Sequence, residues 1–135
     1  MAEFPFTLSD EEWRARLTAE QYATLRQHAT ERPGSCGLLR EHRPGRFHCA
    51  GCGAVLFESG TKFESGTGWP SFDTPVKGAL GVRHDASHNM IRTEVHCANC
   101  GSHMGHVFND GPPPTGLRYC INGVALVFEP RQQHG

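Results

Sequence analysis

Two near-identical stretches decide how this chain folds: HCAGCG at residues 48–53 and HCANCG at residues 96–101. In each, two residues separate a pair of cysteines, and a glycine follows the second cysteine. A knuckle of this kind points both sulfurs at one ion while backbone N–H groups stabilise the sulfur charge. Four thiolates arranged as a tetrahedron suit Zn²⁺ and leave no open coordination position. The sequence therefore predicts one structural zinc ion per chain, with the ligands Cys49, Cys52, Cys97 and Cys100.

The distance between the two pairs favours a sheet that brings them together. Between Cys52 and Cys97 lie 44 residues, more than a minimal zinc ribbon contains. A thioredoxin-type CxxC requires a βαβ setting, whereas here a glycine and then a strand-like run follow. A zinc deaminase requires H-x-E and later P-C-x-x-C, and no proline precedes either pair. Ligand softness and tetrahedral geometry favour zinc over iron.

The composition is typical of one soluble globular domain. The chain has 135 residues with 37% apolar and 20% charged residues, and its net charge is -1. No broad basic field is present for nucleic acid or for a membrane surface. The N-terminus lacks the basic and apolar regions of a signal peptide, and no apolar run approaches the roughly 18 residues of a membrane span. We expect a cytoplasmic protein, a single domain over residues 1–135 and a monomer.

Two helices are expected to cover the core near the N-terminus, within about residues 7–30. Ser9 with Glu12, and Thr18 with Gln21, match capping boxes, which predict helices at roughly 9–16 and 18–29. Inward-facing side chains would be Trp13, Leu17, Tyr22 and Leu25.

A strand-rich body follows the helices, from about residue 38 to residue 129. Pro33 and Gly34 end the helical pattern, and short apolar or alternating runs then recur between Gly, Asn, Asp and Pro residues. These runs cover residues 46–59, 78–85, 89–100, 103–110 and 117–130. The pattern predicts a mainly β fold of antiparallel strands.

Cys120, within GLRYCINGVALVF at residues 116–128, is the most informative cysteine outside the pairs. A free cysteine is often a small buried hydrophobic residue. Arg118 and Asn122, however, lie two positions before and after it, so a strand would direct all three side chains to one face. A cationic or hydrogen-bonding neighbourhood favours the thiolate, which is the nucleophile. A phosphatase Cys-x₅-Arg motif is excluded because residue 126 is Leu.

His103 and His106 follow the second pair closely, on an element that a metal ion would hold rigid. They could serve as catalytic acids beside a reactive thiol, as metal ligands or as ordinary core histidines. A Cys–His hydrolase also remains open. In GTGWPSF, residues 66–72, Trp69 and Phe72 are either core residues or, at Trp69, an exposed apolar wall for a small group such as a methyl.

Taken together, HCAGCGAVLF, FESGTGWPSF and HCANCGSHMGHVFNDGPPPTGLRYCIN resemble the methionine sulfoxide reductase B family in order and spacing. The likeness extends from about Leu17 to Phe128, and the WPSF, GHVF-D and RYC-N blocks carry most of it. The resemblance implies reduction of the R epimer of methionine sulfoxide, free or in proteins. It also implies two antiparallel sheets in a barrel-like or β-tent arrangement, with thioredoxin as the reductant.

The resemblance assigns a role to individual residues. Cys120 matches the nucleophile, and His103 and His106 match the acid and positioning histidines, with His103 as the expected proton donor. Trp69 matches the substrate-pocket tryptophan. The remaining matches are Phe108, Arg118 and Asn122, which line or order the site, and Asp110, which orients Arg118.

One position departs from the family pattern. Many family members carry their recycling cysteine where this chain has Thr67. Cys36, in the Pro-Gly segment ERPGSCG at residues 31–37, is then the remaining thiol that could resolve oxidised Cys120. Gly123 also replaces a commoner serine, and nothing in the sequence explains that change. The alternative function is a non-catalytic zinc module that binds a protein partner through an apolar patch near Trp69.

Overall fold

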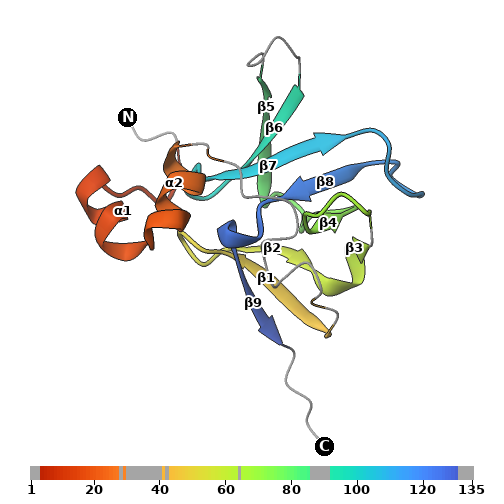
Figure 1. Ribbon diagram of the computed structural model, residues 1–135, viewed down its shortest axis with the longest axis horizontal. Helices are drawn as coiled ribbons and strands as arrows, with labels where there is room; N and C mark the ends of the chain where they lie inside the picture. Colours follow the sequence, from red (N-terminus) through yellow and green to blue (C-terminus); the bar gives the residue numbers. More distant parts are fainter. Residues whose placement is uncertain are drawn as a thin grey trace, which may run out of the picture.

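The structure is a computed structural model of the chain and describes residues 4–27, 29, 41, 43–63, 65–85 and 92–130. Within these residues, two short helices precede nine strands (Figure 1). The helices are α1 (Asp10–Arg16) and α2 (Ala19–Gln27), and single 3₁₀ turns occur at η2 (Ser59–Thr61) and η4 (Gly123–Ala125). The strands are β1 (Gly45–Cys49), β2 (Val55–Glu58), β3 (Lys62–Phe63), β4 (Ser71–Phe72), β5 (Leu80–Asp85), β6 (Arg92–Cys97), β7 (His103–Phe108), β8 (Arg118–Ile121) and β9 (Leu126–Pro130).

Both helix starts agree with the predicted capping boxes. Ser9 Oγ accepts from the backbone N–H of Glu12 at 3.2 Å, and the Glu12 carboxylate accepts from the Ser9 N–H at 3.0 Å. Thr18 and Gln21 repeat this reciprocal pair at 3.1 and 2.9 Å. Each pair satisfies backbone N–H groups that have no partner within the helix.

The helices bury one face each against the strand-rich body. Trp13 and Leu25 are 2% and 1% exposed, Leu17 is also buried, and Tyr22 is half-buried, as predicted. The Arg26 guanidinium lies over the Trp13 ring, 4.5 Å from the ring centroid. The helices therefore cover one end of the body beside β7 and η4 (Figure 1). No helix in the described part of the chain is long and apolar enough to cross a membrane.

The strands form two antiparallel sheets. The smaller sheet has the order β2-β1-β9, and the larger has the order β3-β4-β8-β7-β6-β5. The predicted mainly β class with short N-terminal helices is confirmed. The barrel-like closure is not seen among the described residues, because β3 and β5 stay at the two edges of the larger sheet. Figure 1 shows the two sheets as separate layers, with the β5–β6 hairpin projecting away from the smaller one.

Aromatic rings join the two sheets through the core. Phe57 of β2 stacks on Phe72 of β4 with 4.1 Å between ring centroids and an interplanar angle of 14°. Phe47 of β1 meets Phe72 edge-on at 5.1 Å. All three side chains are fully buried. Offset and edge-on aromatic pairs add to the hydrophobic burial, so these rings fix the spacing between the sheets. Phe72 is therefore a core residue.

The sequence patterns located most strands but missed two. The run at 46–59 contains β1 and β2, and the runs at 78–85, 89–100 and 103–110 contain β5, β6 and β7. Residues 117–130 contain β8 and β9, separated by η4. The two-residue strands β3 and β4 were not predicted, because they are too short to show alternation. They nevertheless matter, since β4 lies directly beside the strand that carries Cys120.

Candidate active site and metal centre

The two cysteine pairs meet in one buried cluster. The first knuckle follows β1 and the second follows β6, so each sheet contributes one pair. The four Sγ atoms all lie within 4.8 Å of one another, with 3.7 Å between Cys49 and Cys100 and 3.6 Å between Cys52 and Cys97. A tetrahedral zinc ion with bonds of about 2.3 Å requires sulfurs roughly 3.8 Å apart. The cluster is therefore consistent with a structural zinc ion.

The four thiols of this cluster shift one another's pKa values in opposite directions. Hydrogen bonds from neighbouring thiols lower the pKa of Cys52 to about 6 and that of Cys100 to about 2. Hydrogen bonding to Cys100 raises the pKa of Cys49 and raises that of Cys97 to about 12. The Gly51 N–H also donates to Cys49 Sγ at 3.3 Å, and Cys100 Sγ donates to the Ser102 hydroxyl at 3.1 Å. A backbone N–H donor stabilises a thiolate, which is the form that binds a metal ion.

A single row of directly opposed residues crosses all six strands of the larger sheet. From β3 to β5 the row runs Phe63, Ser71, Cys120, His106, Glu94 and Arg83. Directly opposed residues in antiparallel strands project their side chains to the same face of the sheet. Cys120 therefore lies between a serine on one side and a histidine on the other, and a glutamate follows one strand further along.

Cys120 opens into a cavity on this face. The cavity has a volume of about 240 Å³, and Cys120 itself is half-buried. Arg118 and Asn122 line it together with Cys120, as the two-residue spacing in a strand predicts. The lining residues within the described part of the chain are Thr67, Trp69, Gly105, His106, Phe108, Arg118, Cys120 and Asn122. Trp69 is thus a wall residue and not part of the core.

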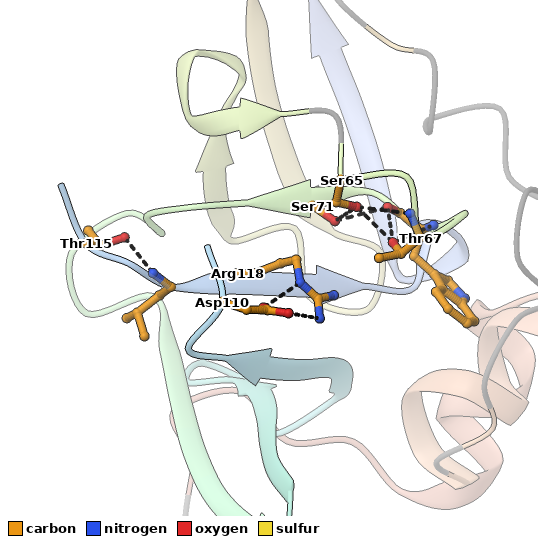
Figure 2. Close-up of polar contacts among 8 residues, drawn as sticks. Ser65, Thr67, Ser71, Asp110, Thr115 and Arg118 are labelled. Carbon is orange, nitrogen blue, oxygen red and sulfur yellow. Dashed lines mark hydrogen bonds and ion pairs between the residues drawn. The ribbon is translucent and has the colours of Figure 1, made fainter. Parts of the chain in front are cut away.

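Arg118 is held in a fixed position beside Cys120. Its Nε and Nη2 atoms donate to the two carboxylate oxygens of Asp110 at 2.8 and 3.2 Å, which is a bidentate ion pair (Figure 2). The guanidinium also lies 4.4 Å above the Phe108 ring. The pKa of Arg118 is raised, first by hydrogen bonding to Asp110 and further by the charges of Asp110 and Cys120, while burial opposes the shift. A planar cation is therefore fixed in the wall of the cavity that Cys120 also lines.

His106 and His103 occupy different positions. His106 lines the cavity, whereas His103 is only 3% exposed and is absent from the lining. Between β6 and β7 the register shifts: Val95 pairs with Gly105 and His96 pairs with His103, with one residue of β7 between the two pairs. A bulge of this kind redirects a side chain. It brings the His103 ring to 5.6 Å from the His106 ring, centroid to centroid.

Glu94 forms a buried hydrogen bond with His103. The Glu94 Oε1 atom and the His103 Nδ1 atom form a hydrogen bond of 3.2 Å, and the Glu94 residue is 7% exposed. A buried carboxylate that hydrogen-bonds one ring nitrogen of a histidine fixes the orientation of the imidazole. Glu94 and His103 are therefore both buried, and of the two histidines His106 is the one that lines the cavity with Cys120.

Asn122 joins β8 to β7 below the cavity. Its backbone N–H and its side-chain Nδ2 both donate to the Met104 carbonyl, at 2.9 and 3.2 Å, and the side chain is 3% exposed. These two bonds fix the end of β8, and with it the strand segment that carries Cys120.

Comparison with known proteins gives the family. Residues 17–130 match the SelR domain. The chain is 57% identical to "Peptide methionine sulfoxide reductase MsrB" of Agrobacterium fabrum, over 90% of this chain and 91% of that protein. The protein of the same name from Bradyrhizobium diazoefficiens is 59% identical over 91% of this chain and 89% of its own. The protein of the same name from Leifsonia xyli is 54% identical, over 97% of this chain and 96% of that protein.

This chain belongs to the MsrB family. The resemblance in the three sequence blocks is therefore confirmed. Among solved structures, the crystal structure of the Mis18 "Yippee-like" domain has a TM-score of 0.54 and covers 67% of this chain and 100% of its own. Its sequence is only 18% identical, so this likeness concerns the fold alone.

Two further positions matter in this MsrB-family chain. Thr67, at the position where many family members carry a recycling cysteine, lines the cavity and forms hydrogen bonds with Ser65 and with Trp69. Cys36, the expected resolving thiol, lies outside the described residues.

Sequence reasoning missed three features of the site in this MsrB-family chain. Glu94 carries no motif, and only the pairing of β6 with β7 connects it to His103. Gly105 was read as part of a strand, although its backbone lines the cavity. Ser65 and Ser71 were assigned no role, yet their hydroxyls contact each other at 2.7 Å. Glu94 and Ser71 are revealed by the register of directly opposed residues, which only the structure gives.

Proposed function

We propose that this MsrB-family chain reduces methionine (R)-S-oxide, free or in proteins, to methionine and so repairs oxidised proteins. The observation that carries the proposal is the cavity that holds Cys120 between His106, Arg118 and Trp69. It combines a nucleophile, a proton donor, a fixed cation and an apolar wall within about 240 Å³. The names of the MsrB relatives support the same substrate.

The first step is attack by the Cys120 thiolate on the sulfoxide sulfur. Arg118 favours the thiolate because its positive charge interacts with the sulfur. As the new S–S contact forms, electron density moves onto the sulfoxide oxygen, which must gain a proton. The S–O oxygen is transferred to Cys120, which becomes a sulfenic acid, and methionine leaves as the thioether.

We assign the proton donation to His106. His106 lines the cavity and lies directly opposite Cys120, whereas His103, the donor expected from the sequence, is buried and does not line the cavity. His103 then acts as a positioning residue, held by Glu94. A proton donor in the correct position contributes roughly 10²–10⁴ in rate.

Trp69 is proposed to contact the S-methyl group, and Phe108 to support Arg118. A sulfoxide sulfur carries a methyl, an oxygen and the side-chain carbon in a fixed handedness. If Trp69 holds the methyl, only one epimer presents its oxygen to His106. This geometry would select the R form.

The Cys₄ cluster is proposed to hold one structural Zn²⁺ ion. All four ligand positions belong to the protein, so the ion would supply rigidity and leave the chemistry to Cys120. It would clamp the β1–β2 turn to the β6–β7 turn. Since β7 begins only three residues after Cys100, this clamp would also fix the strand that carries both histidines.

Recycling is proposed to pass through Cys36. Its thiol would condense with the Cys120 sulfenic acid, form a disulfide and release water. Thioredoxin would then reduce this disulfide by thiol exchange. The two Cα atoms must approach within roughly 4.4–6.8 Å for the bond to close. We further propose one catalytic domain over residues 1–135, acting as a cytoplasmic monomer.

The deciding experiment replaces Cys120 with Ser and measures reduction of N-acetyl-methionine-R-sulfoxide with dithiothreitol. We expect loss of turnover in Cys120→Ser and retention of folding by circular dichroism. Persistent turnover would refute the assignment of the nucleophile. For the recycling step, Cys36→Ser should keep a single turnover but lose cycling driven by thioredoxin; unchanged cycling would refute the role of Cys36.

A further inference from the structure

Three hydroxyl groups from Ser65, Thr67 and Ser71 form one connected cluster beside the cavity (Figure 2). The Ser65 Oγ atom lies 2.9 Å from Thr67 Oγ1 and 2.7 Å from Ser71 Oγ. Ser71 is 1% exposed, so water does not replace these bonds at its hydroxyl. The Ser71 hydroxyl therefore has to find its hydrogen-bond partners within the protein.

Both ends of this cluster terminate on the backbone of Trp69. The Trp69 N–H donates to Thr67 Oγ1 at 3.4 Å, and Ser71 Oγ donates to the Trp69 carbonyl at 3.2 Å. Thr67 Oγ1 also donates to the Trp69 carbonyl, at 3.5 Å. Each hydroxyl has one proton, so with the Thr67 and Ser71 protons on that carbonyl the central Ser65 hydroxyl donates to one of these two neighbours, and it accepts from the Thr67 backbone N–H at 3.4 Å. Hydrogen bonds in such a chain strengthen one another.

The backbone around Trp69 requires this kind of support. Gly66 and Gly68 both have positive φ angles, 75° and 89°, which allow the chain to fold back on itself. Two glycines so close together also leave the backbone much conformational freedom. On the far side, the Pro70 carbonyl accepts from the Ile121 N–H at 2.9 Å, which ties the turn to β8. The hydroxyl cluster holds the same turn through its hydrogen bonds to the Trp69 backbone.

We propose that Ser65 is a positioning residue that holds Trp69 as the cavity wall and thereby sets which sulfur substituent the enzyme accepts. This inference rests on the proposed reduction of methionine sulfoxide. Ser65 is absent from the lining of the Cys120 cavity and lines an adjacent hollow instead. It acts on the substrate through Trp69, because its hydroxyl is the central member of the chain between Thr67 and Ser71.

The first test compares two substrates that differ by one methylene. The substrates are methionine sulfoxide, with an S-methyl group, and ethionine sulfoxide, with an S-ethyl group. One methylene against a fitted apolar wall changes kcat/KM by about 10–200-fold. We expect Ser65→Ala to reduce the wild-type preference for S-methyl by about tenfold, mainly through KM. The control is Thr74→Ala, which removes an exposed hydroxyl that donates to the Asp73 carboxylate.

The second test does not depend on turnover. Hydrogen exchange of the Trp69 backbone amide, followed by NMR, reports the bond from this amide to Thr67 Oγ1 directly. We expect exchange to be about tenfold faster in Ser65→Ala and in Thr67→Val, which lacks the hydroxyl but keeps the shape. Thr67→Ser, which keeps the hydroxyl, should exchange as slowly as the wild-type protein.

The outcomes separate the two proposals. If the wild-type protein reduces neither sulfoxide, the proposed function fails, and the exchange of the Trp69 amide still decides the role of Ser65. If the wild-type protein is active but Ser65→Ala keeps the full preference for S-methyl, the positioning role is wrong. Unchanged exchange in Ser65→Ala would also overturn it, whatever the activity.

Discussion

Gly105 and Cys120 approach so closely that a Cβ atom built on Gly105 would lie 2.0 Å from the backbone carbonyl oxygen of Cys120. Gly105 pairs with Ile121 across the β7–β8 ladder and is buried. Because the obstructing atom belongs to the backbone, a side chain at this position has no flexible neighbour to displace. The closeness of the two strands at the nucleophile therefore depends on glycine.

Gly105→Ala is the direct test of this approach. The added methyl group should force β7 and β8 apart at Cys120, so we expect a stability loss of about 1–3 kcal/mol and a marked fall in kcat. Thermal unfolding and steady-state kinetics would measure both. The matched control is Gly60→Ala, since a Cβ at Gly60 would meet nothing within 4 Å. Wild-type behaviour of Gly105→Ala would show that the strands can separate without cost to the site.

Glu94→Gln should lower kcat and leave KM nearly unchanged. Glu94 contacts His103 and is absent from the cavity lining, so it affects the substrate only through the histidines. Glutamine keeps the size of the side chain but removes its charge. We expect a decrease on the order of tenfold, within the range that acid catalysis contributes. Glu58→Gln, at an exposed position of β2, serves as the control; an equal loss in both variants would argue against a specific role for Glu94.

The ion pair between Arg118 and Asp110 should respond to acid in a defined direction. Hydrogen bonding to Arg118 lowers the pKa of Asp110 below its ordinary value of 3.8. The stabilisation is therefore present above pH 3.8 and is lost as the pH falls through the lowered pKa. NMR titration of the Asp110 carboxyl should show the lowered value in the wild-type protein and a return toward 3.8 in Arg118→Gln. An unchanged titration in that variant would show that the pair does not hold in solution.

Removal of one sulfur from the Cys₄ cluster should remove both the metal ion and the fold. Structural zinc contributes about 10–16 kcal/mol of apparent binding free energy in small peptides, comparable with the 5–15 kcal/mol stability of a whole domain. We expect Cys97→Ser to contain no stoichiometric zinc by elemental analysis and to lack a cooperative unfolding transition. Cys120→Ser should retain one zinc ion per chain. A folded, metal-free Cys97→Ser protein would mean that the core alone supports the sheets.

Local patterns in the sequence were sufficient wherever the deciding contacts lie a few residues apart. The capping boxes of Ser9 and Thr18 act over three positions, and both begin helices as predicted. The alternation of a strand places Arg118, Cys120 and Asn122 on one face without reference to any other strand. The duplicated cysteine pairs require a common meeting point, because one ion needs all four sulfurs.

Only the tertiary structure decided which distant residues meet at Cys120. The pairing of β6 with β7 and β8 brings Glu94, His106 and Cys120 into one row, and a one-residue shift would send each side chain to the other face. The bulge before Gly105 then turns His103 toward Glu94, and the two-residue strand β4 brings Ser71 beside Cys120. Register between distant strands arises from the packing of the whole core, with the Phe57–Phe72 stack at its centre, and no short stretch of sequence contains that information.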